Sequence, residues 1–230
     1  MFKKKNILVI VAHPDDETLG CAGAILNHIS NGDKVFCVYM SDGVSSRNFN
    51  KQNKVLIKNR KNNAEKVSKI LGFKWLFDFS GKFPDNQMDN ISLLKVVMVI
   101  EEVKKKVNPH IIYTHFPYDL NVDHQVVATA TMTAFRPQAD EKWEKILSFE
   151  VPSSTDYAYF KNKFFSPNYF LNIEKFWKKK KRAILCYGKE IKKYPNSRSL
   201  KGLEILSKLR GTESGVNQAE AFQILREIKR

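Results

Sequence analysis

A short polar segment near the start of the chain contains residue types that bind catalytic metal ions. The segment is His13-Pro14-Asp15-Asp16-Glu17, and it follows the almost continuous apolar run at 6–12. Imidazole and carboxylate groups are common ligands of catalytic zinc, in sites that keep one position open for water or substrate. Acidic residues also cap the first turn of helices, but capping does not explain a His-Pro pair directly after an apolar strand.

A second polar cluster follows a later apolar segment, at 110–114. Its members are His115, Asp119, Asn121, Asp123 and His124. Two imidazoles and one carboxylate on one face of a divalent ion leave positions open for water and substrate. Such an ion lowers the pKa of bound water, and a second carboxylate beside the ligand carboxylate can accept the proton of that water. The Asp15-Asp16 doublet supplies both carboxylates.

The elements around these clusters are expected to bring them together. Apolar runs predict strands at 6–12, 34–40, 74–79, 110–114 and 146–151, and helical spacing predicts helices at 18–29, 55–71, 92–107 and 122–134. Strands that alternate with helices are typical of a mostly parallel sheet with right-handed crossovers, in a three-layer Rossmann-like α/β sandwich. In such a sheet the strand after the reversal of strand order lies beside the first, so the two clusters face each other.

The last third of the chain is less regular. We predict helices at about 174–190, 198–209 and 217–229, with aromatic residues between them. The whole chain, 1–230, is expected to form one domain, with a core at about 1–150 and a C-terminal helical or irregular cap at about 151–230.

The net charge is +15, and residues 161–230 carry 18 Lys or Arg against 6 Glu. A basic surface favours anionic partners, such as a phosphorylated small molecule, nucleic acid or a membrane surface, although a solvated helix face has the same composition. No recognisable nucleic-acid motif is present, so we expect no nucleic-acid partner. Peripheral membrane contact through the basic C-terminal region is an open alternative. The sequence does not indicate the oligomeric state.

Composition also indicates the cellular compartment in which the protein is expected. The three cysteines, Cys21, Cys37 and Cys186, have no CxxC spacing, which argues against a disulfide framework and favours buried thiols. No apolar run approaches the roughly 20 residues that a membrane helix needs. The apolar run after the basic N-terminus is too short for an export signal, so we expect a cytoplasmic protein.

These residues give the chain a resemblance to a known family, the PIG-L-type or LmbE-like metal-dependent N-deacetylases, which remove the acetyl group from an N-acetylated amino sugar. The family motif AHPDDE after an N-terminal strand is present unaltered at 12–17. The resemblance implies that His13, Asp16 and His124 bind Zn²⁺, with Fe²⁺ as an alternative. It also implies that Asp15 is the general base. His124 matches the histidine that ends the second family motif, in Asn121-Val122-Asp123-His124.

Two positions depart from the family pattern. Many members have a histidine three residues before the last ligand that assists at the oxyanion, and this chain has Asn121 there. An amide can donate a hydrogen bond to an oxyanion but cannot transfer protons at neutral pH, so Asn121 or His115 is the expected donor. Many members also carry Arg-x-x-Glu before the end of the second helix. Here Arg60 is kept, but Asn63 replaces the glutamate.

Further candidates surround the expected crevice. Asp42 and Arg47 follow the second predicted strand and are candidates for contact with a sugar or phosphate, with plain turn chemistry as the alternative. Arg60 and His115 complete the candidate substrate-binding set. Asp123 is expected to orient a neighbouring side chain, as carboxylates do for metal-bound histidines.

The sequence therefore predicts a zinc-dependent hydrolase that deacetylates an amino sugar, presented as a small molecule or as a nucleotide-linked or lipid-linked precursor. Three alternatives remain. A catalytically altered family member would serve as a sugar- or anion-binding module. A basic nucleic-acid-binding protein would bind in a salt-sensitive manner that does not depend on His13. A non-haem iron oxygenase uses the same ligand types, but usually in a β-barrel.

Overall fold

The strands of the sheet explain why the first apolar run is almost continuous. In β1 (Asn6–Val11), Ile7, Val9 and Val11 face one core cluster and Leu8 and Ile10 face the other. A strand buried on both faces has no polar face, as expected for parallel sheets covered by helices on both sides. The computed structural model that gives this fold describes residues 4–47, 54–159 and 162–229.

The sheet has seven strands in the order β3-β2-β1-β4-β5-β7-β6. The further strands are β2 (Lys34–Tyr39), β3 (Lys74–Trp75), β4 (Ile111–His115), β5 (Lys145–Phe149), β6 (Tyr169–Asn172) and β7 (Ala219–Glu227). The first five are parallel, and β7 pairs antiparallel with both β5 and β6. Because β4 lies directly beside β1, the polar segments that follow these two strands meet at one edge of the sheet, as predicted.

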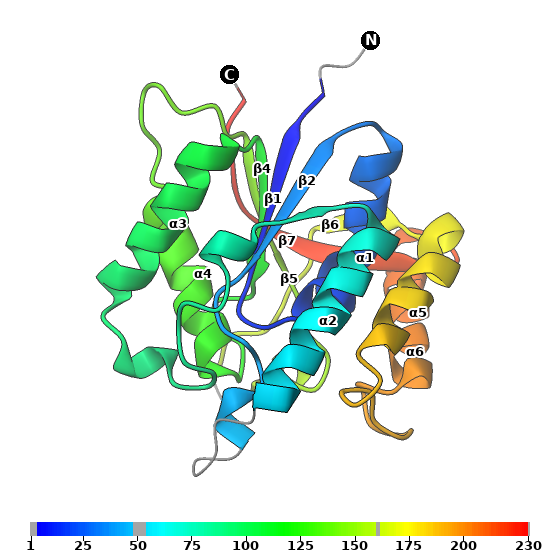
Figure 1. Ribbon diagram of the computed structural model, residues 1–230. Helices are drawn as coiled ribbons and strands as arrows, with labels where there is room; N and C mark the ends of the chain where they lie inside the picture. Colours follow the sequence, from blue (N-terminus) through cyan, green and yellow to red (C-terminus); the bar gives the residue numbers. More distant parts are fainter. Residues whose placement is uncertain (1–3, 48–53, 160–161, 230) are drawn as a thin grey trace.

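Helices cover both faces of the sheet (Figure 1). They are α1 (Asp16–Ser30), α2 (Lys54–Leu71), α3 (Leu93–Val107), α4 (Val122–Ala134), α5 (Trp177–Cys186) and α6 (Leu200–Ser214). Residues of α3 and α4 pack in one core cluster, and residues of α1, α2, α5 and α6 pack in the other. The predicted three-layer α/β fold is confirmed. Within the described ranges, none of the helices combines the length and the apolar composition of a membrane-spanning segment.

Two predicted elements are wrong. The segment predicted as a helix at 217–229 forms the strand β7, because it is inserted between β5 and β6 and its backbone pairs with both. The strand predicted at 74–79 is only Lys74–Trp75, and Phe77–Phe79 forms a 3-10 turn. Sequence analysis also missed β6. The region after residue 150 therefore supplies two strands of the sheet in addition to the helices α5 and α6.

Two of the three cysteines are buried, whereas most of the basic run is exposed. All three thiols are free, with Cys21 and Cys37 buried and Cys186 half-buried. In the basic run at 178–182, four side chains are exposed, but Lys180 is buried. The burial of one lysine within this run points to a specific internal partner.

That partner is Glu220 of β7, and the pair is located at a break in α1. The helix loses helical geometry at Cys21, where φ is −143° and ψ is 22°. The Glu220 carboxylate accepts hydrogen bonds from the backbone N–H groups of Gly23 and Ala24, at 2.7 and 2.8 Å. Lys180 Nζ lies 2.7 Å from Glu220 Oε1 and donates to the carbonyl of Leu19 at 3.1 Å.

These contacts supply partners to buried backbone groups at the break, where unpaired groups would be costly. Gly23 permits the close approach, because a Cβ there would lie 2.3 Å from Ile173 Cγ2 and 3.0 Å from Glu220 Cδ. The Lys180–Glu220 pair thus fixes the first part of α1, which begins with Asp16, against α5 and β7.

Replacing Glu220 by alanine is expected to lower the free energy of unfolding by about 3–5 kcal/mol, because Lys180 would stay buried without its carboxylate. Urea unfolding measures this change. Glu204→Ala is the matched control, since it breaks the Glu204–Lys208 pair, which has the same 2.7 Å distance but is exposed. The control should change the free energy of unfolding by at most about 1 kcal/mol. Equal losses in the two variants would contradict the role of the buried pair.

Candidate metal centre and active site

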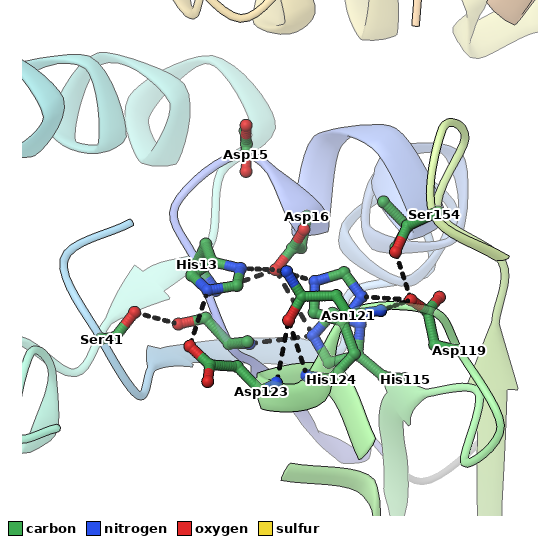
Figure 2. A network of polar contacts seen from close by, with 12 residues as sticks. His13, Asp15, Asp16, Ser41, His115, Asp119, Asn121, Asp123, His124 and Ser154 are labelled. Carbon is green, nitrogen blue, oxygen red and sulfur yellow. Dashed lines mark hydrogen bonds and ion pairs between the residues drawn. The ribbon is translucent and has the colours of Figure 1, made fainter. Parts of the chain in front are cut away.

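The centre of the site is the Asp16 carboxylate, on which three imidazoles converge (Figure 2). Asp16 Oδ2 lies 3.3 Å from His13 Nδ1 and 3.4 Å from both His115 Nε2 and His124 Nε2. It also accepts a hydrogen bond from the backbone N–H of His13 at 2.8 Å. His13 follows β1, Asp16 begins α1, His115 ends β4 and His124 lies in the first turn of α4. Two polar segments that are far apart in sequence, 13–16 and 115–124, therefore meet at one oxygen atom.

The residues present fit a divalent cation. His13, Asp16 and His124 are buried, and each offers one ligand atom within 4.8 Å of the others. Burial alone would lower the pKa of both imidazoles. Contacts with Asp123 and Asp16 instead raise the pKa of His13 to about 10, and contacts with Asp16 and Asp119 raise that of His124 to about 9. A pocket that attracts positive charge this strongly, with two nitrogen donors and one oxygen donor, suits a catalytic metal site.

Asp123 contacts the imidazole of His13 on the side opposite Asp16. Its Oδ2 lies 3.0 Å from His13 Nε2, and its two oxygens accept the backbone N–H groups of Asn86 and Met88 at 2.7 and 3.0 Å. Asp85 Oδ1 lies 3.3 Å from the same His13 nitrogen. These contacts direct His13 Nδ1 toward Asp16, which is the geometry expected of a carboxylate that orients a metal-binding histidine.

Asp119 has the equivalent position beside His124. Its Oδ1 lies 3.1 Å from His124 Nδ1, and the hydroxyls of Ser154 and Thr155 donate to its carboxylate. Burial opposes ionisation of Asp119, but His124 and the two hydroxyls outweigh it and lower the pKa of Asp119 to about 2. Both candidate metal-binding histidines are therefore contacted by a carboxylate on the side away from Asp16.

His115 packs against the ring of His124 and is completely buried. Its ring stacks on His124 at 3.9 Å, and its Nε2 accepts a hydrogen bond from the Ala12 N–H at 2.9 Å. Burial and the adjacent His124 charge lower the pKa of His115 to about 4, so the ring is neutral. The ring of His124 lies against it, and direct contact of His115 with substrate stays a prediction.

Asp15 lies beside the candidate metal ligands but faces two arginines. Its φ of 135° places it in a backbone region that L-amino acids seldom adopt. Such backbone strain is found preferentially at functional sites. Its Oδ2 lies 3.2 Å from Arg60 Nη1 and 3.6 Å from Arg198 Nη1. In Figure 2 its carboxylate stands apart from the contacts around Asp16. Burial raises the pKa of Asp15, and the two arginines only partly oppose this.

Asn121 is the N-cap of α4. Its carbonyl oxygen accepts from the N–H groups of Asp123 and His124, and its amide nitrogen donates to Asn86 Oδ1 at 2.9 Å. Both ends of this side chain thus have protein partners. Its role as an oxyanion donor stays a prediction, and the structure gives it the additional role of starting the helix that carries His124.

The predicted substrate-binding residues lie in different environments. Arg60 of α2 is buried; its guanidinium donates to the carbonyl of Pro14 and pairs with Glu190. Asp42 Oδ1 accepts the N–H groups of Val44 and Ser45 at 2.8 Å, which is the turn chemistry named as the alternative. Arg47 ends a 3-10 turn, and its side chain lies outside the described part of the structure.

Three residues of the site were not predicted from the sequence: Asp85, Glu190 and Arg198. The structural role of Glu17 was not predicted either. Glu17 is completely buried; it accepts hydrogen bonds from Tyr187 Oη and the Asp15 N–H, both at 3.0 Å, and burial raises its pKa to about 8. Asp85, Glu190 and Arg198 lie in loops without periodic spacing, so the sequence carried no signal for them beyond their charge.

Residues 8–135 match the PIG-L family model, described as GlcNAc-PI de-N-acetylase. The chain belongs to the PIG-L family. The matched segment contains the three candidate ligands and Asp15, whereas Lys180, Arg198 and Glu220 lie beyond it. As a PIG-L family member the protein is an N-deacetylase, from a family of metal-dependent enzymes.

Named relatives agree with this membership. The PIG-L chain is 30% identical over 159 residues to the uncharacterized deacetylase YaiS of Escherichia coli, a match that covers 66% of this chain and 77% of YaiS. Two solved structures share the fold. The conserved protein TT1542 of Thermus thermophilus has a TM-score of 0.72 and 18% identity, covering 98% of this chain and 97% of that one. The N,N'-diacetylchitobiose deacetylase of Pyrococcus horikoshii has a TM-score of 0.74 and 19% identity, covering 96% and 84%.

Replacing Asp123 by alanine is expected to weaken metal binding about 10- to 100-fold, because the imidazole of His13 would lose the carboxylate that orients it. Competition with a chromophoric chelator measures this affinity without reference to activity. Asp33→Ala is the matched control: it removes a carboxylate 2.7 Å from His28 Nδ1, in a His–Asp pair outside the site. Wild-type affinity in the Asp123 variant would show that this contact does not support the metal ligand.

Proposed function

We propose that this PIG-L deacetylase is a zinc-dependent hydrolase that removes the N-acetyl group from an N-acetylated amino sugar. The observation that carries the proposal is the convergence of His13 and His124 on Asp16, with Asp15 next to this group in sequence and outside it in space. Two nitrogens and one carboxylate oxygen suit Zn²⁺, and Fe²⁺ accepts the same donors. The name of the Pyrococcus deacetylase, which specifies an N-acetylated disaccharide, supports a sugar substrate.

The chain supplies the positions that amide hydrolysis requires. His13, Asp16 and His124 would hold the metal, which when bound polarises the amide carbonyl and promotes ionisation of water. Asp15 would accept a proton from the attacking water and return it to the nitrogen as the C–N bond breaks, so that acetate and a free amine leave. To act as base, the Asp15 carboxylate must come within about 2.6–3.2 Å of that water. In the structure it pairs with Arg60 and Arg198.

Two other candidate functions have weaker support. A catalytically altered member that only binds sugars or anions would explain Asn121, but the metal-ligand and base positions are all present. Contact with an anionic membrane surface, or a lipid-linked substrate, is supported by the exposed side chains of Lys178, Lys179, Lys181 and Arg182 on α5. Nothing in the described site favours nucleic acid.

The proposed function predicts acetate release from at least one N-acetylated amino sugar. The panel contains free, nucleotide-linked and lipid-linked N-acetyl sugars, each assayed with the metal-loaded enzyme and after treatment with a chelator. Activity should be lost with the metal, and Zn²⁺ should restore it at least as well as Fe²⁺. Absence of acetate from every substrate, with metal bound, would favour the binding module.

Asp15→Asn is expected to lower kcat by about 10²- to 10⁴-fold, the usual contribution of a general acid–base residue, while the metal content stays unchanged. Metal analysis of the same preparation is the control, because it separates a lost base from a lost metal site. A variant that binds metal and keeps wild-type kcat would rule out Asp15 as the base.

A further inference from the structure

The surface of the C-terminal region exposes positive charge with almost no negative charge beside it. From Trp177 to Lys201, eight lysine or arginine side chains are exposed: four on α5, three in the loop that follows, and Lys201 on α6. The single acidic residue in this range, Glu190, is buried. A helix face that is only solvated usually carries charges of both signs. α3, which packs on the other face of the sheet, has that mixed pattern, because Glu101 and Glu102 accompany its lysines.

The outer face of α5 combines these cations with an aliphatic side chain. Leu185 follows Lys181 by four residues and Lys178 by seven, a spacing that places all three on the same side of the helix. Leu185 is 50% exposed, whereas the adjacent Ile184 is buried in the core. α5 therefore buries one apolar face inside the protein and presents a leucine among positive charges on the other.

α6 repeats this pattern. Ile205 and Leu209 are exposed and four residues apart, and Lys208 lies on the same face. Glu204 is paired with Lys208 at 2.7 Å, and its pKa is lowered by Lys208 and also by Lys181 of α5. Because a charge of α5 acts on a side chain of α6, the outer faces of the two helices are parts of one surface.

The loop between the two helices, residues 187–199, extends this surface toward the metal centre (Figure 1). Lys192 and Tyr194 are exposed, and Lys201 Nζ of α6 lies 4.4 Å from the centroid of the Tyr194 ring. The same loop carries Arg198, whose Nη1 lies 3.6 Å from Asp15 Oδ2. A partner bound to this surface would therefore lie close to the proposed active site.

The composition of the surface selects among anionic partners. Lysine and arginine side chains attract any dense array of phosphates. Aliphatic side chains, however, find no complement on the sugar–phosphate backbone of a nucleic acid, which proteins contact through hydrogen bonds. An anionic bilayer accommodates both kinds of side chain, because its headgroups attract the cations and aliphatic groups enter the boundary between headgroups and acyl chains. A tyrosine suits the same boundary, since its ring is apolar and its hydroxyl is polar.

We propose that the outer faces of α5 and α6, together with the loop 187–199, form a docking surface for an anionic lipid bilayer. The cations contact the lipid headgroups, and Leu185, Ile205 and Leu209 enter the boundary beneath them. None of the three candidate metal ligands belongs to the docking surface. Docking is therefore independent of the proposed deacetylation, and each can fail without the other.

Cosedimentation of the full chain with lipid vesicles tests the docking surface. The vesicles contain either phosphatidylcholine alone or phosphatidylcholine and phosphatidylglycerol in equal parts. Wild-type protein is expected to bind the anionic vesicles and not the neutral ones. Lys181→Gln/Arg182→Gln should weaken this binding about 10- to 30-fold, since each cation near an anionic surface contributes about a factor of five. Failure of the wild-type protein to bind anionic vesicles would contradict the proposal.

Lys95→Gln/Lys105→Gln is the matched control, because it removes the same charge from exposed positions of α3. This variant should bind anionic vesicles nearly as well as the wild type, since salt screens charges that are distant from the membrane. Equal weakening in the two double variants would show that net charge, and not the docking surface, causes binding. Thermal melting of both variants separates a loss of binding from a loss of stability.

A single apolar substitution distinguishes a bilayer from another polyanion. Leu185→Gln is expected to weaken binding to anionic vesicles about 3- to 10-fold, because the side chain no longer enters the apolar boundary. Leu94→Gln is its control, since Leu94 is exposed on α3, and it should have no effect. Single-stranded RNA is assayed in parallel and should bind more weakly than the anionic vesicles. Tighter binding of RNA, or vesicle binding that is unchanged by Leu185→Gln, would overturn the assignment to a membrane.

Discussion

The buried Asp16 carboxylate is the constraint on which the rest of the site depends. An ionised carboxylate inside a protein is strongly destabilising unless positive charge and hydrogen bonds compensate it. Burial by itself would raise the pKa of Asp16, but the positive charge of His124 opposes burial, and the pKa of Asp16 lies well below its ordinary value. The surrounding imidazoles are fixed in turn by Asp119 and Asp123. The result is an alternating arrangement of carboxylates and imidazoles in which a divalent cation would complete the balance of charge.

The fold brings this arrangement together through the neighbouring positions of β1 and β4. Each strand ends at the same edge of the sheet and is followed by a helix, and the first turns of α1 and α4 carry Asp16 and His124. The negative side chains near these helix starts also agree with the helix dipole. Asn121 starts α4 by capping its free N–H groups. The residues that begin these helices therefore also position the candidate ligands.

The C-terminal part of the chain is as important to the site as the part that carries the ligands. Glu220 and Lys180 stabilise the break in α1 behind Asp16. Arg198 and Glu190 approach Asp15 and Arg60 from the same region. Ser154 and Thr155 hold Asp119. Residues 13–124 therefore supply the reactive groups, and the region after residue 150 restricts their orientation.

Local sequence patterns were sufficient to predict four strands of the sheet and the candidate metal ligands, whereas the surroundings of those ligands depend on packing between distant segments. Apolar runs predicted β1, β2, β4 and β5 because a strand buried on both faces consists mostly of apolar residues, and the positions of His13, Asp16 and His124 relative to those strands indicated a candidate metal site. The 217–229 segment was misassigned because its helix-favouring residues are overridden by pairing with β5 and β6. Asp85 and the Lys180–Glu220 pair were not foreseen, since a single charged residue acquires its role only from the distant segment that packs against it.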